Sequence, residues 1–315
     1  MTGSLTSRLA LSRSAVDRDY LTRSRPGLVD ELRADPLTRA VVLRRGSALM
    51  EDGDRPRLRL VPLASLPGAD LLVYLGRALE GQASGAPIVA AVVDEAAAAA
   101  LEPDPERWGD LRRLGADLDA LDAGLFTQAL AITNWHASHG YSPRTGQPTL
   151  PAQGGWVRHP EGQDDEAGGH HVFPRTDPAV IMGVVDGQDR LLLGANALWG
   201  GERYSILAGF VEPGESLESA VIREVREESG LTVVDPVYVG SQPWPFPASI
   251  MIGFRARLDP AGPAEPVPDG VELIDLRWFS RDELTDANRT IGIPGRTSIA
   301  RAIIEQWFGG PLDAP

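Results

Sequence analysis

Three glutamates in the second half of the chain have a spacing that could bind a metal ion. Glu224, Glu227 and Glu228 occupy positions i, i+3 and i+4 of a segment without Gly or Pro, so a helix would place them on one face. Bare carboxylates about 4 Å apart repel each other by about 1 kcal/mol in water and about 4 kcal/mol near a protein surface. A cation among them removes that repulsion, and oxygen ligands favour Mg²⁺ or Mn²⁺. Taken alone, the cluster is equally typical of a solvated acidic helix face.

The segment that carries these glutamates has clear helix boundaries. Ser216 is a candidate N-cap, and Gly230 falls where a left-handed residue is expected to end a helix. Apolar residues recur between them at helical spacing and predict a buried face: Leu217, Ala220, Val221 and Val225.

Together with the turn before it, this helix resembles the Nudix box. The sequence has Gly209, five residues, Glu215, seven residues, and then REVREESGL up to Leu231. The resemblance implies a hydrolase of nucleoside diphosphates linked to another group, with an α/β/α sandwich fold built on a mixed sheet. It implies that Glu224, Glu227 and Glu228 hold the metal and perform catalysis. It also assigns structural roles, including an Arg223–Glu215 ion pair, to four residues: Gly209, Glu215, Arg223 and Gly230.

Composition narrows the class of protein. The chain has 315 residues, a formal net charge of −14 and no cysteine. Its length suits two domains, and its acidity argues against broad electrostatic binding to nucleic acid or to an anionic membrane. The absence of cysteine excludes disulfides, thiolate metal sites and a cysteine nucleophile. Without a long apolar run or a signal-peptide pattern, the sequence predicts a cytoplasmic protein.

Residues 1–135 are expected to form a smaller β-rich α+β domain with a structural or dimerisation role. Short apolar runs between Gly, Pro and Asp predict strands at Ala40–Leu43, Arg57–Pro62, Leu71–Leu75 and Pro87–Val93. Helices are expected at Glu95–Leu101, Pro105–Leu114 and Gly124–His139. No catalytic constellation is visible in this part of the sequence.

Residues 136–172 are expected to form a loop-rich insert. All five histidines of the protein lie in it: His136, His139, His159, His170 and His171. Their spacing matches no common zinc pattern, and the neighbouring Gly, Pro and acidic residues indicate a flexible tip. We therefore expect solvated or hydrogen-bonding histidines, with a structural metal as the alternative.

Residues 173–315 are expected to form one α/β domain. Strands are predicted at Ala179–Val185, Arg190–Leu193, Tyr204–Ala208, Val237–Gly240, Ile250–Leu258 and Leu273–Phe279, with a second helix at Thr297–Phe308. Asp186-Gly187-Gln188-Asp189 is typical of a hairpin turn.

A proline- and aromatic-rich segment follows the box. Three prolines between Ser241 and Ala248 fix φ, and the sequence predicts a stiff, irregular loop that presents Trp244 and Phe246. Such a loop could stack a flat heteroaromatic ring, or it could be a packing corner.

The segment SQPWPFP, together with NWH at Asn134–His136, GGW at Gly154–Trp156 and FPRTDPAVI from Phe173, resembles the NADH pyrophosphatase (NudC-like) family of Nudix hydrolases. This resemblance implies hydrolysis of the pyrophosphate of NADH and NAD⁺ to nicotinamide mononucleotide and AMP, with removal of NAD caps from RNA as a related activity. It also implies a homodimer. A Nudix hydrolase of another compound such as ADP-ribose, or a non-catalytic nucleotide-sensing module, is the alternative.

The family resemblance assigns roles to further residues. Metal ligands are implied at the Ala208 carbonyl, Glu224, Glu227, Glu228 and Glu272. Substrate contacts are implied at Arg112, Phe173, Phe210, Gln242, Pro243, Trp244, Pro245, Phe246, Pro247, Ala248, Ser249 and Ala300. Related proteins carry a four-cysteine zinc ribbon, but Ser142 and Thr145 stand where its first cysteine pair is expected. The structural zinc is therefore expected to be lost, whereas the catalytic Mg²⁺ or Mn²⁺ is retained.

Overall fold

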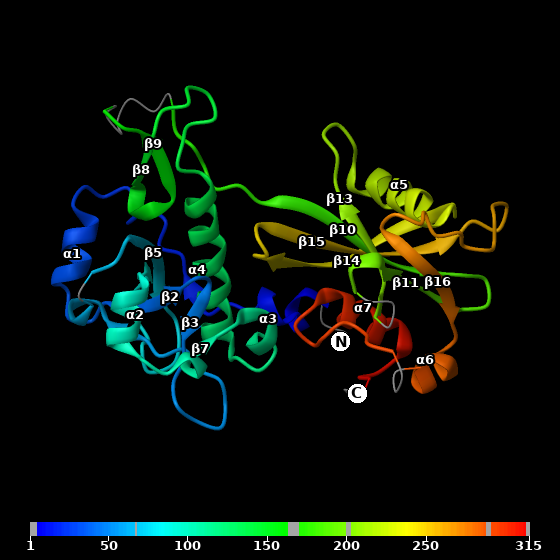
Figure 1. The fold of residues 1–315 in the computed structure, drawn as a ribbon, viewed down its shortest axis with the longest axis horizontal. Coiled ribbons are helices and arrows are strands. Elements are labelled where there is room, and N and C mark those ends of the chain that lie inside the picture. The colour runs from blue at the N-terminus through cyan, green and yellow to red at the C-terminus, as the bar shows by residue number, and fades with distance from the viewer. Residues whose placement is uncertain (1–4, 67, 163–169, 200–202, 288–290, 313–315) are drawn as a thin grey trace. The chain divides into compact units, whose positions relative to one another are not determined.

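The chain forms two compact units. The structure, a computed structural model, describes residues 5–66, 68–162, 170–199, 203–287 and 291–312 (Figure 1). The N-terminal unit comprises the described residues of 10–176 together with the short segment 244–248. The C-terminal unit comprises the described residues of 5–9, 177–243 and 249–312. The insert expected at residues 136–172 thus belongs to the N-terminal unit, except for residues 163–169, which lie outside the described residues.

The C-terminal unit is built on a mixed sheet. Its strands follow the order β12 (Tyr204–Ser205), β11 (Leu191–Asn196), β10 (Asp177–Val185), β15 (Ser249–Leu258) and β14 (Val233–Trp244). In addition, β13 (Leu207–Phe210) pairs with β10, and β16 (Leu273–Phe279) pairs with β11. The central pair β10–β15 is parallel, whereas β10 is antiparallel to β11 and β13.

Helices cover both faces of this sheet, so the predicted α/β/α sandwich is confirmed (Figure 1). Strand residues alternate between faces, as the period of two requires. Val180, Met182 and Val184 pack with the apolar side of α5 (Leu217–Ser229). Ile181 packs instead in the cluster of α7 (Ile299–Phe308), where α6 (Arg281–Ala287) contributes Leu284.

The N-terminal unit repeats this plan on a second mixed sheet. Its strands follow the order β1 (Val16–Asp17), β5 (Leu71–Ala78), β6 (Pro87–Val92), β2 (Arg39–Arg44), β3 (Ser47–Leu49) and β7 (Trp108–Gly109), and β4 (Val61–Pro62) pairs with β2. The pair β2–β6 is parallel. The long helix α4 (Ala120–Ser138) packs on one face of this sheet, and α1 (Leu28–Ala34) and α2 (Glu95–Leu101) pack on the other.

Two predicted elements of the N-terminal unit are wrong. Pro105–Leu114 is not one helix, because a 3₁₀ turn (Pro105–Arg107) leads into β7, which pairs with β3, and only then does Asp110 cap α3 (Leu111–Leu114). The strand predicted at Arg57–Pro62 is reduced to β4, preceded by an isolated bridge between Leu58 and Met50.

The proline-rich segment is more regular than predicted. Strand β14 continues through Ser241, Gln242 and Pro243 to Trp244, although proline was expected to exclude regular structure there. Because β14 ends the strand order of its sheet, a residue without an N–H is tolerated there. Only the turn between β14 and β15, residues 245–248, is irregular.

The histidine-rich insert is also more ordered than expected. Strands β8 (Thr149–Ala152) and β9 (Val157–Pro160) pair in an antiparallel hairpin. The single strand predicted at Tyr204–Ala208 is wrong, because the chain forms two strands there: β12 pairs with β11, and β13 pairs with β10. The predictions for α2 and β16 have the observed bounds, and the turn expected at Asp186–Asp189 connects β10 to β11. No helix within the described residues has the length and apolarity needed to cross a membrane.

Candidate functional site

Helix α5 positions the three glutamates of the predicted metal site. Ser216 caps its first turn by accepting a hydrogen bond from the Ser219 N–H, and Gly230 ends it in the left-handed conformation at φ 68°. Burial of Ala220, Val221 and Val225 against the sheet fixes the rotation of the helix. The glutamates then differ in environment, because Glu227 keeps 60% of its side chain exposed, Glu224 keeps 13%, and Glu228 is almost fully buried.

Glu224 lies against the backbone of β13. A methyl group at Gly209 would stand only 2.0 Å from Glu224 Cδ, so a residue with a side chain cannot replace this glycine without moving the carboxylate. Burial raises the pKa of Glu224, while its bond to Arg223 acts in the opposite direction. Gly209 of β13 thus leaves space for the carboxylate of the helix.

Glu228 has the most unusual environment of the site. Its Oε2 atom is buried and makes no hydrogen bond among the described residues. Burial raises the pKa of Glu228 to about 8, and repulsion from Glu272, Glu224, Asp269 and Glu227 adds to the effect. A buried carboxylate without a donor is unstable unless it is protonated or binds a cation. The orphaned oxygen and the surrounding acidic groups therefore fit a divalent cation.

Arg223 ties α5 to the loop before it. Its Nη2 and Nε atoms bind the two carboxylate oxygens of Glu215 at 2.6 Å and 3.1 Å. Its Nη1 atom donates to Glu224 at 2.8 Å and to Glu227 at 3.0 Å, and Nη2 also donates to the Phe210 carbonyl at 2.9 Å. The hydrogen bonds from Arg223 to Glu215 lower the pKa of the Glu215 carboxyl, with a further contribution from the Glu212 N–H. One guanidinium thus holds the loop, the strand end and two of the glutamates together.

Glu272 stands at the start of β16, where Asn196 donates to its carboxylate at 3.4 Å. The nearby Asp269 was missed by the sequence analysis, although Asp-Gly at 269–270 is a turn signal. Its carboxylate accepts from the N–H groups of Val271, Glu272 and Leu273, and these bonds lower its pKa despite some desolvation. Asp269 thus fixes the turn that presents Glu272.

The acidic groups lie near one another without converging. Among the described residues, no three Asp, Glu or His side chains are arranged as ligands of one ion. The Ala208 carbonyl belongs to β13, which pairs Ala208 with Ile181 of β10.

The predicted substrate residues fall in both units. Gln242 is fully buried in the C-terminal unit, where its amide donates to the Thr297 carbonyl at 2.7 Å while its Oε1 atom has no partner among the described residues. Ala300 is buried in the first turn of α7. Phe210 and Phe173 are 60% and 65% exposed, so their rings are available for stacking.

The aromatic pair of the β14–β15 turn belongs to the N-terminal unit. The rings of Trp244 and Phe246 meet edge to face with centroids 4.9 Å apart, and both pack against the buried core that includes α4. The guanidinium of Arg112 lies 4.3 Å from the Phe246 centroid and 5.4 Å from that of Trp244. Arg112 therefore contacts the aromatic residues that the sequence grouped with it as substrate contacts.

Hydrogen bonds hold the histidine-rich segment, which stands where related proteins are expected to carry a zinc ribbon. Arg158 is buried and donates to His136 Nδ1 at 2.7 Å and to Thr149 Oγ1 at 2.7 Å, and His136 Nε2 donates to the Gly155 carbonyl at 2.7 Å. Burial lowers the pKa of His136 to about 4, and the charge of Arg158 acts in the same direction, so the imidazole is neutral. Ser142, in place of a cysteine, accepts from the N–H groups of Arg144 and Thr145.

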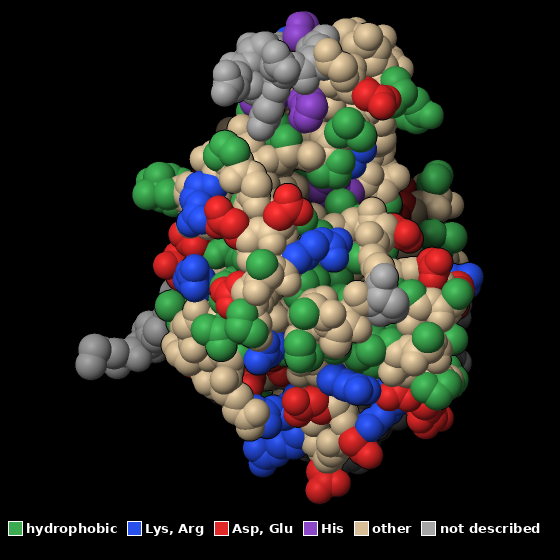
Figure 2. Space-filling view, turned by 90° about the vertical axis from the view of Figure 1, so that its left-hand side faces the viewer, with side chains coloured by type: hydrophobic (Ala, Val, Ile, Leu, Met, Phe, Trp, Pro, Cys, Tyr) green, Lys and Arg blue, Asp and Glu red, His purple; other side chains and the backbone are tan. Residues whose placement is uncertain are grey.

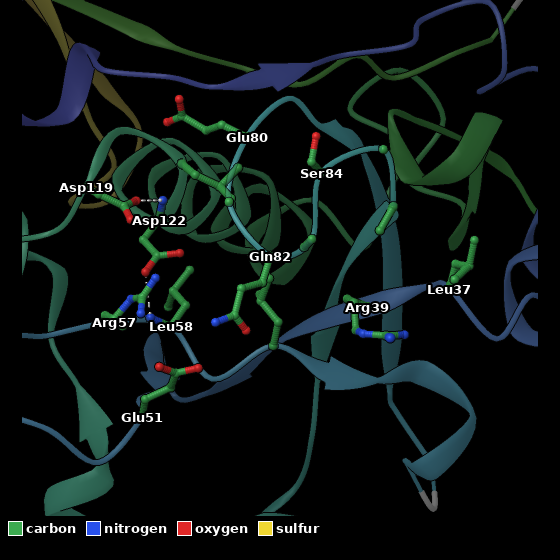
Figure 3. A pocket seen from close by; sticks show the side chains of 16 residues that line it. Leu37, Arg39, Glu51, Arg57, Leu58, Glu80, Gln82, Ser84, Asp119 and Asp122 are labelled. Carbon is green, nitrogen blue, oxygen red and sulfur yellow. Dashed lines mark hydrogen bonds between the residues drawn. The ribbon is translucent and has the colours of Figure 1, made fainter.

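The N-terminal unit also has a pocket of about 640 Å³ (Figure 3). Asp119 and Asp122 reach it from the start of α4, and both have roles in the fold. Asp119 caps the helix by accepting from the Asp122 N–H at 2.9 Å, and Asp122 accepts from the Leu58 N–H at 2.9 Å. On the face of the molecule drawn in Figure 2, acidic and basic side chains are interspersed rather than gathered by sign.

Comparisons with known proteins match two separate parts of the chain to two family models. The NUDIX domain family model matches residues 175–300, and that of the NADH pyrophosphatase-like rudimentary NUDIX domain matches residues 37–135. The NAD-capped RNA hydrolase NudC of Mycobacterium bovis (strain BCG / Pasteur 1173P2) is 40% identical over 316 residues, covering 92% of this chain and 96% of the relative. The human NAD-capped RNA hydrolase NUDT12 is 38% identical over 197 residues, covering 59% of this chain and 42% of the relative. Among solved structures, a NUDIX hydrolase from Nitrosomonas europaea covers 43% of this chain and 90% of its own, at 24% identity and a TM-score of 0.35.

Proposed function

Because the chain belongs to the NADH pyrophosphatase (NudC-like) family of Nudix hydrolases, we propose that it hydrolyses the pyrophosphate of NADH and NAD⁺. The products are nicotinamide mononucleotide and AMP. The same reaction at the 5′ end of an RNA removes an NAD cap, the activity for which the two relatives are named. The observation that carries the proposal is the buried, unpartnered Glu228 carboxylate within the acidic cluster of the box helix.

The cofactor in this proposal is Mg²⁺ or Mn²⁺. The groups that would hold it are the carboxylates of Glu224, Glu227, Glu228 and Glu272 and the Ala208 carbonyl. When bound, such an ion neutralises charge on the pyrophosphate and makes a water molecule more acidic. The chemistry of these oxygen donors fits hard cations, and the orphaned oxygen of Glu228 supports the assignment.

The glutamates of α5 also provide the proton acceptor. Attack of water on phosphorus releases a proton, and a carboxylate of Glu224, Glu227 or Glu228 accepts it. Arg223 orients two of these groups through its bonds to Glu224 and Glu227, and Glu215 in turn fixes the guanidinium. Two glycines have structural roles in this proposal. Gly209 leaves space for the Glu224 carboxylate, and Gly230 ends α5 in the left-handed conformation.

Recognition of the dinucleotide is assigned to aromatic and loop residues. The family resemblance assigns Phe173, Phe210 and Trp244 to the nicotinamide, and the high exposure of both phenylalanines supports stacking. The segment Gln242–Ser249, Ala300 and Arg112 provide the remaining contacts.

The test is hydrolysis of NADH, NAD⁺, ADP-ribose and NAD-capped RNA side by side, with Mg²⁺ or Mn²⁺ and with product analysis. The expected result is nicotinamide mononucleotide and AMP from NADH and NAD⁺, with little activity on ADP-ribose. Preference for ADP-ribose would favour a different Nudix hydrolase. Binding of nucleotides without turnover of any substrate would favour a sensing module.

We also propose that the active form is a cytoplasmic homodimer, which the family resemblance supports. Light scattering after size-exclusion chromatography should then give twice the chain mass of 33.7 kDa. A mass of 33.7 kDa at the concentrations used for activity assays would contradict the dimer.

A further inference from the structure

Trp244, the last residue of β14, and the turn that follows it, which contains Phe246, have few hydrogen-bond donors. Pro245 and Pro247 have no backbone N–H, so neither residue can donate a backbone hydrogen bond. Within this segment, the Phe246 N–H donates to the Trp244 carbonyl at 2.7 Å. Donors for the carbonyls of Pro245 and Pro247 come from outside this segment.

Asn134, in the last part of α4, supplies both. Its side-chain nitrogen donates to the Pro245 carbonyl and to the Pro247 carbonyl, each at 3.0 Å. A primary amide carries two N–H donors, so one side chain satisfies two acceptors that lie on either side of Phe246. These bonds connect residues 111 and 113 positions apart in the chain, yet all of them belong to the N-terminal unit.

The two hydrogen bonds constrain the aromatic pair. Phe246 lies between the two bonded carbonyls, and its ring packs edge to face on that of Trp244. The rings rest on the buried core of α4, with the Arg112 guanidinium over them. Loss of the Asn134 bonds would leave these carbonyls to water and widen the range of ring orientations, without removing any buried core residue.

We propose that Asn134 is a positioning residue that holds Trp244 and Phe246 in the orientation that binds nicotinamide. The inference rests on the proposed function, because it assumes that the turn contacts a nicotinamide dinucleotide. Asn134 acts through the turn and does not touch the substrate. Its effect should therefore fall on binding of the nicotinamide half rather than on the chemical step.

Three variants separate hydrogen bonding from packing. Asn134→Ala removes the donors and the side chain. Asn134→Asp keeps the shape, but its carboxylate has no donors and faces two carbonyl oxygens. Ser138→Ala is the matched control, since Ser138 lies one turn further on α4 and bonds to the Asn134 backbone carbonyl rather than to the turn.

The expected result is a rise of roughly tenfold in KM for NADH in Asn134→Ala, with kcat within about threefold of wild type, because about two ordinary hydrogen bonds are lost. Asn134→Asp should be at least as impaired as Asn134→Ala. Activity on ADP-ribose, whatever its wild-type level, should change much less. In calorimetry without metal, nicotinamide mononucleotide should bind more weakly to both variants than to wild type, whereas AMP should bind equally. Ser138→Ala should behave as wild type.

Several outcomes would overturn the inference. An Asn134→Asp variant equal to wild type would mean that only the shape of the side chain matters. Equal losses on NADH and ADP-ribose, together with a lowered Tm, would assign Asn134 a general structural role. Wild-type hydrolysis of NADH with unchanged Asn134 variants rejects this inference alone, whereas a wild type that does not hydrolyse NADH rejects the proposed function and the inference with it.

Discussion

Helices α4 and α5 occupy similar places in the two units and have opposite characters. Each packs on one face of a mixed sheet whose central pair is parallel. In α4 most of the circumference is buried, including polar residues such as Gln128 and His136. In α5 one narrow face is buried, and the remainder carries arginine and glutamate.

The difference shows that the layered fold does not itself create a reactive site. The chemistry proposed for α5 rests on three features: Gly209, which leaves space for the Glu224 carboxylate; Arg223, which binds Glu215 of the preceding loop; and Glu228, whose buried Oε2 atom has no donor among the described residues. The corresponding helix in the N-terminal unit instead holds that unit together and, through Asn134, the aromatic turn. We therefore expect substitutions near α5 to change turnover and substitutions near α4 to change stability or binding.

The largest effect is expected from Glu228→Gln. Turnover should fall at least ~100-fold, about 2.7 kcal/mol of barrier, because an amide neither holds a divalent cation as a carboxylate does nor accepts a proton. Tm measured without metal should not fall, since a neutral amide of similar shape replaces a buried carboxyl group whose pKa is raised to about 8. The measurement is NADH turnover at saturating Mg²⁺ alongside thermal unfolding. The exposed Glu218→Gln on the same helix is the control, and near-normal turnover in Glu228→Gln would reject its assignment.

Trp244→Ala tests the aromatic segment 244–248 of the N-terminal unit. Its kcat/KM for NADH should fall roughly 30-fold, because the loss of stacking and of apolar contact amounts to about 2 kcal/mol. ADP-ribose, which lacks the nicotinamide, should lose much less. Trp307→Ala, at a half-buried tryptophan of α7, controls for general effects of removing an indole. An equal loss on the two substrates would make Trp244 a packing residue.

Arg158→Ala should show the opposite signature, with a lower stability and an unchanged turnover. The variant leaves His136 Nδ1 and Thr149 Oγ1 without their donor, which should cost about 2–3 kcal/mol of unfolding free energy. Urea unfolding and NADH turnover measure the two effects, with the exposed Arg144→Ala as control.

The wild-type protein is expected to carry no stoichiometric zinc and to keep its Tm in EDTA. A fall in Tm in EDTA that added zinc reverses would instead indicate a structural zinc site.

The smallest effect is expected from Asp122→Asn. Burial raises the pKa of Asp122 from 3.8 to about 6, so the native state binds this proton more tightly than the unfolded chain. Stability should therefore fall as pH rises through this range, and the cost should persist above it. The neutral amide avoids that cost and should be more stable than wild type by about 1 kcal/mol at pH 8, with the difference vanishing near pH 4. Thermal unfolding across this pH range checks the sign, and Glu80→Gln, at an exposed carboxylate that lines the same pocket, is the matched variant (Figure 3).

The sequence alone determined the elements whose causes are local. Helix α5 begins at Ser216 and ends at Gly230 because capping and left-handed turns depend on neighbouring residues, and its glutamates share a face because the helical period is fixed. The turn between β10 and β11 follows from Asp-Gly in the same way. The acidic box and the aromatic segment were therefore recognisable before any contact was known.

Only the tertiary structure decided which of these groups are buried and which distant groups they meet. The sequence gives no sign that Glu228 lacks a donor, that Arg158 lies beside His136, or that Asn134 binds a turn 111 residues away. It also led to wrong expectations at Pro105–Leu114 and Pro243, where strand pairing overrode local preference. The physical reason is range: helix caps and periodicity act over a few residues, whereas burial and sheet position depend on how the whole chain packs.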